Sequence, residues 1–170
     1  MKKFLVIGNP IEHSLSPQIH EFWFKKNNLN ASYKKQKLNN TDLRDYILKI
    51  KNKEIDGMNV TIPFKKEIIS YLDVLSAEAE KTQSVNTIGL SNNKVTGHNT
   101  DINGFKFAIK DTKYNATNKN VFIIGAGGVV PSIILALIDM NVSNIIVTNR
   151  TKSKADELKK LFKNIKIVEW

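Results

Sequence analysis

Four short polar stretches of the sequence combine hydroxyl, amide, amino and carboxylate side chains at close spacing. They are Ser14–Pro17 (SLSP), Asn59–Lys65 (NVTIPFK), Ser84–Thr87 (SVNT) and Gly97–Gly104 (GHNTDING). Each lies where a predicted strand ends or a predicted helix begins. Amides and hydroxyls can bind ring hydroxyls, whereas a lysine and an aspartate can move a proton. The combination therefore suits a small polyhydroxylated acid.

The first stretch places two hydroxyl groups at the start of a predicted helix. Ser14 and Ser16 lie two residues apart, and the sequence predicts Ser16 as the N-cap with Pro17 in the first helical position. A helix N-terminus attracts negative charge, so the two hydroxyls can hold a carboxylate there. The alternative is that Ser16 only caps its helix.

The next two stretches carry amides and a hydroxyl that suit ring hydroxyls. Asn59 and Thr61 lie on the same face of a predicted strand, and Asn86 follows at a further strand end. Because the carboxyl ends of parallel strands meet at one edge of a sheet, we expect these side chains to share a ligand. Asn86 and Asn99 have the alternative interpretation of ordinary turn residues.

One lysine and one aspartate form a candidate acid–base pair. Lys65 follows the third predicted strand and Asp101 begins a predicted helix. Opposite charges that face each other stabilise one another, and such a pair can hold a reacting oxygen and transfer its proton. The alternatives are a solvated Lys65, like the neighbouring Lys66, and an Asp101 that only caps its helix.

A glycine-rich turn indicates a nucleotide site in the second part of the chain. Gly125, Gly127 and Gly128 lie between the hydrophobic run VFIIG and an apolar helix. Glycines at such a turn let the backbone approach a pyrophosphate at the helix N-terminus. The match to G-x-G-x-x-G/A is imperfect because Val130 occupies its last position. An ordinary strand–helix turn is the alternative.

The end of the following strand favours NADP over NAD. An NAD site expects a carboxylate there for the ribose 2′-hydroxyl. The sequence instead offers hydroxyl, amide and basic side chains, which suit a 2′-phosphate: Thr148, Asn149, Arg150, Thr151 and Lys152.

Strands and helices alternate along the chain, which predicts an α/β fold with mostly parallel sheets in two units. Predicted strands cover residues 3–8, 31–38, 55–63, 121–125, 144–150 and the start of one at 165–170. Predicted helices cover residues 16–27, 40–52, 65–72, 76–83, 101–111, 131–140 and 152–162. Residues 85–91 and 94–99 flank Asn92–Asn93, which predicts a β-hairpin.

The alternation divides the chain into three predicted regions. Residues 1–101 form an α/β substrate-binding domain, residues 102–119 a connecting helix and polar linker, and residues 120–170 part of a Rossmann-type nucleotide-binding domain. A mononucleotide-binding half needs three strands, and only two and the start of a third are present. We therefore expect the protein to continue beyond Trp170.

Composition excludes several classes of protein. The net charge of +10 comes almost entirely from scattered lysines, since Arg44 and Arg150 are the only arginines, and this disfavours nucleic-acid binding. Solvated lysine-rich faces are the simplest interpretation, and attraction of small anions is the alternative. No segment approaches the ~20 apolar residues of a membrane span.

The chemistry of metals and thiols is also disfavoured. Without cysteine, the chain has no disulfide, thiolate nucleophile or zinc-thiolate site. His13, His20 and His98 lack ligand spacing, so no metal site is predicted. We expect a cytoplasmic protein that binds neither nucleic acid nor membrane.

Taken together, these stretches resemble the shikimate dehydrogenase family. The patterns S-x-S-P-x-x-H, N-V-T-x-P-x-K, V-N-T and N-T-D-x-x-G occur in this order, and the G-A-G-G turn and N-R-T complete the set across the 170 residues. The resemblance implies NADP-dependent interconversion of 3-dehydroshikimate and shikimate, in chorismate and aromatic amino-acid biosynthesis. It also implies an N-terminal substrate domain, a C-terminal NADP domain and a cleft between them. A homodimer is compatible with it.

The resemblance assigns a role to each matching residue. Ser14 and Ser16 would bind the substrate carboxylate, and Lys65 would be the catalytic lysine paired with Asp101. The substrate hydroxyls would be bound by Thr61, Asn86 and Asp101. The pyrophosphate turn would comprise Gly125, Ala126, Gly127, Gly128 and Val129. The 2′-phosphate would be held by Asn149, Arg150, Thr151 and Lys152.

Two departures from the family pattern leave alternatives open. GAGGVVPS replaces the commoner alanine-rich continuation. The family's C-terminal segment, with a substrate-binding glutamine and nicotinamide contacts, is not part of the sequence. One alternative is a quinate/shikimate dehydrogenase, which accepts a further ring hydroxyl and often prefers NAD. The other is a non-catalytic fragment that binds shikimate.

Overall fold

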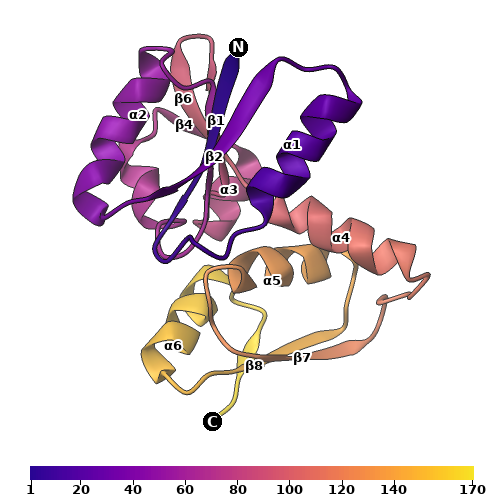
Figure 1. Cartoon of the computed structure of the whole chain (residues 1–170). Coiled ribbons are helices and arrows are strands. Elements are labelled where there is room, and N and C mark those ends of the chain that lie inside the picture. Colours follow the sequence, from indigo (N-terminus) through magenta and orange to yellow (C-terminus); the bar gives the residue numbers. More distant parts are fainter. The chain divides into compact units, whose positions relative to one another are not determined.

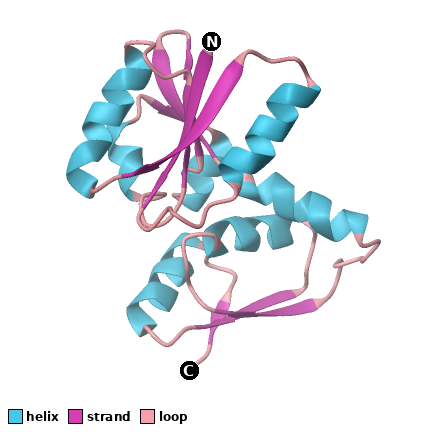
Figure 2. Ribbon diagram, viewed as in Figure 1, coloured by secondary structure: helices cyan, strands magenta, loops and turns pink.

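The computed structural model describes all 170 residues, and the chain divides into two compact units (Figure 1). The first unit comprises Met1–Ala79 and Val85–His98, and the second comprises Glu80–Ser84 and Asn99–Trp170. Both units combine a sheet with helices (Figure 2), which confirms the predicted α/β fold class. None of the helices is long and apolar enough to cross a membrane.

The first unit is built on a six-stranded sheet in the order β2-β1-β3-β5-β6-β4. Its strands are β1 (Lys2–Gly8), β2 (Ala31–Lys37), β3 (Gly57–Val60), β4 (Val74–Leu75), β5 (Thr87–Ser91) and β6 (Lys94–His98). The pairs β1–β2, β1–β3 and β4–β6 are parallel, whereas β3–β5 and β5–β6 are antiparallel. The predicted hairpin is confirmed, and Asn92 and Asn93 adopt the positive φ angles of a tight turn, 49° and 60°.

Helices cover both faces of this sheet. α2 (Leu43–Lys51) buries Leu43, Ile47 and Ile50, which share one helical face, in a core that includes Ile7 of β1. α1 (Ser16–Lys26) has no fully buried residue and packs through Phe24 beside Val6 and Tyr33. Consecutive residues of a strand point to opposite faces, so Val6 and Ile7 place α1 and α2 on opposite faces of the sheet.

Two predicted elements of the first unit have other boundaries. The strand expected at residues 55–63 is only β3, and the helix expected at residues 65–72 is wrong: a turn leads into a 3₁₀ helix at Glu67–Tyr71. The carbonyl of Lys65 accepts a hydrogen bond from the Val85 amide at 2.8 Å and so serves a neighbouring segment instead of a helix. The short strand β4 was not predicted.

The second unit contains a three-stranded parallel sheet, β7-β8-β9, as predicted. Its strands are β7 (Asn120–Ile124), β8 (Asn144–Thr148) and β9 (Lys166–Ile167), and its helices are α4 (Asp101–Asp111), α5 (Val130–Asp139) and α6 (Lys152–Leu161). α3 (Ala77–Thr82) contains the point where the chain first enters this unit. Ile134 and Leu158 pack against Val147 in the core. The polar segment 112–119 lies inside this unit.

Candidate functional site

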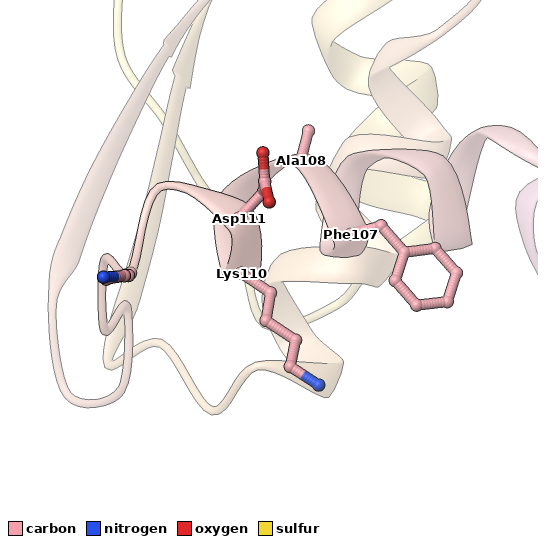
Figure 3. A pocket seen from close by; sticks show the side chains of 5 residues that line it. Phe107, Ala108, Lys110 and Asp111 are labelled. Atoms are coloured by element: carbon pink, nitrogen blue, oxygen red, sulfur yellow. The ribbon is translucent and has the colours of Figure 1, made fainter.

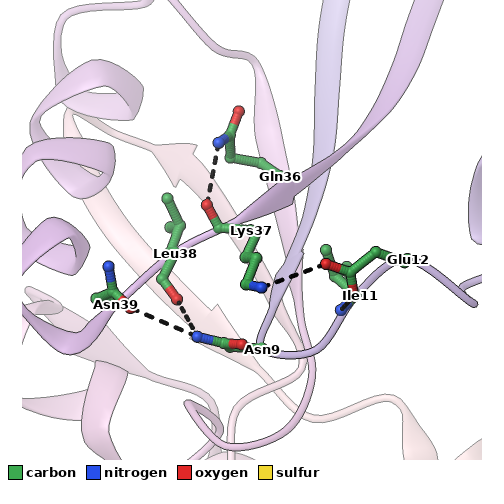
Figure 4. Close-up of polar contacts among 7 residues, drawn as sticks. All are labelled: Asn9, Ile11, Glu12, Gln36, Lys37, Leu38 and Asn39. Atoms are coloured by element: carbon green, nitrogen blue, oxygen red, sulfur yellow. Dashed lines mark hydrogen bonds and ion pairs between the residues drawn. The ribbon is translucent and has the colours of Figure 1, made fainter.

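The loop that carries Ser14 is fixed to the end of β2 (Figure 4). Asn9 Nδ2 donates to the Leu38 carbonyl at 3.1 Å, and Lys37 Nζ lies 3.4 Å from Glu12 Oε1. The Glu12 carboxylate also accepts the Ile11 N–H at 2.9 Å. Hydrogen bonds from backbone amides, aided by Lys37, hold the pKa of Glu12 below its usual 4.5. These contacts hold the approach to α1 against the end of β2.

Ser14 and Ser16 lie together at the N-terminus of α1. Ser14 Oγ donates to Ser16 Oγ at 3.2 Å and accepts the Ser16 N–H at 3.3 Å. The prediction that Ser16 is the N-cap is wrong, because Ser16 is the first helical residue and Pro17 the second. Ser14 Oγ instead accepts the Ser16 N–H, which has no partner within the helix. The two half-buried hydroxyls and the helix N-terminus form a group that can bind a carboxylate.

Thr61 follows the end of β3, where that strand runs very close to β1. Its amide donates to the Ile7 carbonyl at 2.9 Å, and the Asn9 amide donates to the Ile62 carbonyl at 3.0 Å. A Cβ on Gly8 would lie 2.6 Å from Thr61 Cγ2. This close approach requires glycine at position 8. Thr61 itself is half-buried, with its backbone fixed.

Asn59 and Asn86 are joined by hydrogen bonds on the face of the sheet that α1 covers. Asn59 Nδ2 donates to the Asn86 carbonyl and to Thr87 Oγ1, both at 3.1 Å. Thr87 Oγ1 donates in turn to Asn86 Oδ1 at 2.9 Å. Tyr33 OH donates to Asn59 Oδ1 at 2.6 Å. The direct contact of Asn59 with a ring hydroxyl stays a prediction, since its amide already serves three protein groups.

Tyr33 and His20 belong to this cluster. Sequence reasoning missed Tyr33, and it noted His20 only as the last position of the S-x-S-P-x-x-H pattern and as a histidine without metal-ligand spacing. The Tyr33 ring is 3% exposed and stacks on the His20 imidazole, with 4.1 Å between centroids and 4° between planes. Burial raises the pKa of Tyr33 to about 12, an effect that a hydrogen bond from Ser16 partly offsets, and burial lowers the pKa of His20. For Tyr33, the only signal in the sequence was a lone aromatic residue in a strand rich in lysine.

In the turn after β3, the neighbouring residues Lys65 and Lys66 differ in exposure. Phe64 is buried at 1% exposure and anchors the turn, Lys65 is half-buried, and Lys66 is exposed. The hydrogen bond from the Val85 amide to the Lys65 carbonyl holds this turn against the segment that carries Asn86. In the first unit, Lys65 thus belongs to the same strand-end cluster as the two asparagines.

Asp101 lies in the second unit, as the first residue of α4. The N-cap position of this helix is Thr100, one residue earlier. Asn99 Oδ1 accepts the Asp101 N–H at 3.1 Å, and Asn99 Nδ2 contacts Thr82 Oγ1, the Ser84 carbonyl and Ser132 Oγ at 2.8–3.0 Å. Asn99 is only 4% exposed, so it ties three segments together and is more than a turn residue.

The glycine-rich turn between β7 and α5 has the geometry that a pyrophosphate site needs. Gly125 has a φ of +117°, and its amide donates to the Thr148 carbonyl at 2.8 Å. A Cβ on Gly127 or Gly128 would meet no protein atom within 4 Å. Protein packing therefore does not explain these two glycines, whereas a phosphate that approaches the backbone at the α5 N-terminus would. The residues present fit a dinucleotide.

The segment after β8 is suited to a phosphate. Asn149 Nδ2 donates to the Thr151 carbonyl at 2.8 Å, which shapes the turn. Arg150 and Thr151 precede α6 and Lys152 begins it; all three are exposed, and the first turn of α6 contains no acidic residue. Gly125 and Thr148 bond to each other, so the glycine-rich turn and the end of β8 lie at the same edge of the sheet.

Two pockets on the surface lie elsewhere in the second unit. One is lined by Phe107, Ala108, Lys110, Asp111 and Lys113 at the end of α4 (Figure 3). The other extends from α4 over the segment that follows it. Neither contains a predicted site residue, so they do not define the candidate site.

These features define the class of the protein: an α/β chain that combines a polar strand-end cluster with a dinucleotide-type βα turn. Two family models match it, the shikimate dehydrogenase substrate binding domain over residues 6–88 and shikimate / quinate 5-dehydrogenase over residues 107–169. The chain belongs to the shikimate dehydrogenase family.

Individual relatives agree with this assignment. The chain is 53% identical over 169 residues to the shikimate dehydrogenase (NADP(+)) of Pelagibacter ubique (strain HTCC1062). This match covers 99% of the chain and 64% of the relative. The shikimate dehydrogenase structure from Aquifex aeolicus superposes with a TM-score of 0.92 at 34% identity, over 99% of the chain and 62% of that structure. The chain thus spans a little less than two thirds of the length of these relatives.

A further solved structure contains both ligands. The shikimate 5-dehydrogenase of Thermus thermophilus, in complex with NADP(H) and shikimate, matches with a TM-score of 0.89 at 30% identity. The match covers 99% of the chain and 63% of that structure.

Proposed function

We propose that this chain provides the substrate side and the first part of the cofactor side of an NADP-dependent shikimate dehydrogenase, which interconverts 3-dehydroshikimate and shikimate. The observation that carries the proposal is the strand-end cluster of the first unit, where hydroxyls, amides and one lysine converge. The glycine-rich turn supports it independently. The role in chorismate and aromatic amino-acid biosynthesis follows from the same reaction.

The substrate side is proposed to bind an acidic, hydroxylated ring. Ser14 and Ser16 donate to the carboxylate at the N-terminus of α1, where the helix dipole favours negative charge. Thr61 and Asn86 bind ring hydroxyls from the ends of β3 and its neighbouring segment. Asn59 contributes through the hydrogen bonds that hold Asn86.

The chemical step needs a proton at the oxygen that becomes a hydroxyl. NADPH, when bound, supplies the hydride. Lys65 and Asp101 are proposed to hold the 3-oxygen of the substrate and to deliver its proton, which a positioned group accelerates typically ~10²–10⁴-fold. Asn99 fixes the start of α4 and thereby the backbone of Asp101.

The cofactor side is proposed to hold NADP in two places. The pyrophosphate would lie against the turn at Gly125–Val129, where the α5 N-terminus presents backbone amides. The 2′-phosphate would bind Asn149, Arg150, Thr151 and Lys152, and the guanidinium can form paired hydrogen bonds with it. The absence of a carboxylate in this segment favours NADP over the NAD that a quinate/shikimate dehydrogenase often prefers.

A second candidate is that this chain alone binds shikimate without turnover. The observation in its favour is the span of the chain, since the Pelagibacter ubique relative contains a further third of sequence. The hydrogen-bonded group of Asn59 and Asn86 lies within the first unit and is formed by residues of this chain alone.

The test measures shikimate binding by calorimetry and NADP⁺ reduction by absorbance with this chain. Binding with turnover supports the dehydrogenase, and binding alone supports the second candidate. A chain that neither binds nor oxidises shikimate contradicts both.

Where turnover occurs, Lys65→Met should lower kcat by about 10²–10⁴-fold while shikimate affinity changes by less than about tenfold. Lys66→Met is the matched control, because it removes the same charge from the neighbouring exposed position.

A further inference from the structure

A continuous chain of hydrogen bonds runs across the first unit on the α1 side of its sheet. It starts at Tyr33, passes through Asn59, and ends at Thr87 and Asn86. We call these side chains the Tyr33 relay. Tyr33 lies on β2 and Asn59 on β3, and β1 runs between these two strands. Val6 of β1 is the register partner of Asn59, and Val6 also packs beside Tyr33. The relay therefore crosses β1 from one strand to another.

The direction of each hydrogen bond in the relay is fixed by chemistry. The Asn86 carbonyl can only accept, so the group of Asn59 that faces it at 3.1 Å is the amide nitrogen. Asn59 must then present its oxygen to Tyr33, and the phenol donates its single hydrogen across 2.6 Å. A flipped Asn59 would set two acceptors against each other.

The same reasoning continues to Asn86. Asn59 Nδ2 also donates to Thr87 Oγ1 at 3.1 Å, and the threonine hydroxyl donates its own hydrogen to Asn86 Oδ1 at 2.9 Å. The oxygen of the Asn86 amide therefore faces Thr87, and its nitrogen defines the donor side of the residue.

We propose that Tyr33 and Thr87 are positioning residues, which orient the Asn86 amide so that it donates to a hydroxyl oxygen of the ligand. The identity of that ligand as shikimate rests on the proposed function. Tyr33 acts through Asn59 and Thr87 acts directly, and neither needs to touch the ligand.

Burial makes the relay stable over the physiological pH range. Tyr33 is 3% exposed and its ring is stacked on His20, so its hydrogen bond to Asn59 is largely shielded from solvent. Because burial raises the pKa of Tyr33 to about 12, the phenol keeps the proton that the relay requires.

The test replaces single groups of the relay in this chain. Tyr33→Phe keeps the ring and removes the hydroxyl, and Thr87→Val removes the second hydroxyl at nearly constant volume. We expect each to shift the side-chain amide NMR signals of Asn86 and to lower shikimate affinity about three- to tenfold, as for one lost hydrogen bond. Thr87→Ser restores the hydroxyl and should restore both readouts. Tyr71→Phe is the control, because it removes a phenol from the surface of the same unit.

The two proposals can fail separately. If the unaltered chain does not bind shikimate, the proposed function of the chain fails, whereas the Asn86 amide signals still report on the relay. If those signals are unchanged in folded Tyr33→Phe and Thr87→Val, or if Thr87→Ser behaves like Thr87→Val, the relay does not position Asn86 and the inference is overturned.

Discussion

At the scale of single residues, the candidate site is supported by groups that have no chemistry of their own. Gly8 shows this most directly. It allows the ends of β1 and β3 to approach, which brings Thr61 against the β1 backbone. An added methyl group would be 2.6 Å from Thr61 Cγ2 and 3.0 Å from the Ile62 carbonyl oxygen.

We therefore expect Gly8→Ala to lower the free energy of unfolding by about 1–3 kcal/mol, the usual cost of overpacking. Chemical denaturation measures this directly. Gly89→Ala in β5 is the control in the same sheet, because a Cβ there meets nothing within 4 Å, and it should change stability by less than about 0.5 kcal/mol. Equal effects of the two substitutions would refute the steric account.

His20 gives a pH dependence whose sign is determined. Burial lowers the pKa of His20 from 6.5 in the folded state, so the unfolded chain binds the proton more readily. Stability from this residue is complete above pH 6.5 and declines as the pH falls through that value towards the lower folded pKa. The stack on Tyr33 weakens in the same window.

Thermal unfolding at a series of pH values tests this prediction. His20→Phe keeps an aromatic ring against Tyr33 but cannot titrate, so its unfolding temperature should fall less than that of the unaltered chain between pH 7 and pH 5. Parallel profiles for the two proteins would show that His20 does not contribute to the acid sensitivity.

At the scale of elements, local sequence patterns predicted most strands and helices, but not the side-chain hydrogen bonds that join different elements. The apolar spacing of Leu43, Ile47 and Ile50 identifies α2, and Asn92–Asn93 identifies the hairpin. The contact between Tyr33 and Asn59 spans 26 residues, and that between Asn99 and Ser132 spans 33. Such contacts depend on sheet register and helix docking, which a local pattern does not specify.

The prediction of a helix at residues 65–72 failed for a related reason. These residues permit a helix, but the Lys65 carbonyl is used by Val85, twenty residues on in the chain. A tertiary hydrogen bond thus overrides local propensity. The candidate residues themselves were predictable from their types and order, whereas the residues that orient them were not.

In the glycine-rich turn, substitution can distinguish a glycine that the backbone conformation requires from glycines that only a ligand would require. Gly125 has a φ of +117°, so Gly125→Ala should lower the free energy of unfolding by about 1–3 kcal/mol. At Gly127 and Gly128 a Cβ has open space, so alanine should change stability by less than about 1 kcal/mol. If a pyrophosphate lies against this backbone, alanine at either position should nevertheless weaken NADP⁺ binding.

Paired measurements of unfolding and of NADP⁺ affinity decide this point. Loss of affinity without loss of stability supports the phosphate site. Unchanged affinity in both Gly127→Ala and Gly128→Ala would show that no phosphate approaches the turn, and the glycines would then belong to an ordinary strand–helix connection.

At the scale of the whole molecule, the net charge of +10 attracts anions from a distance, and this attraction must be separated from local recognition. The chain offers a matched pair for that purpose, since Arg44 and Arg150 are its only arginines and both are exposed. Arg44→Gln and Arg150→Gln lower the net charge equally, but only the second removes a guanidinium from the proposed 2′-phosphate site.

We expect Arg150→Gln to weaken NADP⁺ binding about tenfold or more, because charge-assisted hydrogen bonds to the phosphate are lost, and to leave NAD⁺ binding nearly unchanged. Arg44→Gln should alter both affinities only slightly and in the same direction. Titrations at low and at physiological ionic strength complete the test, because salt screens the general attraction more than a direct contact. If the two variants instead lose NADP⁺ affinity equally, the preference comes from total charge, and the segment Asn149–Lys152 does not select the cofactor.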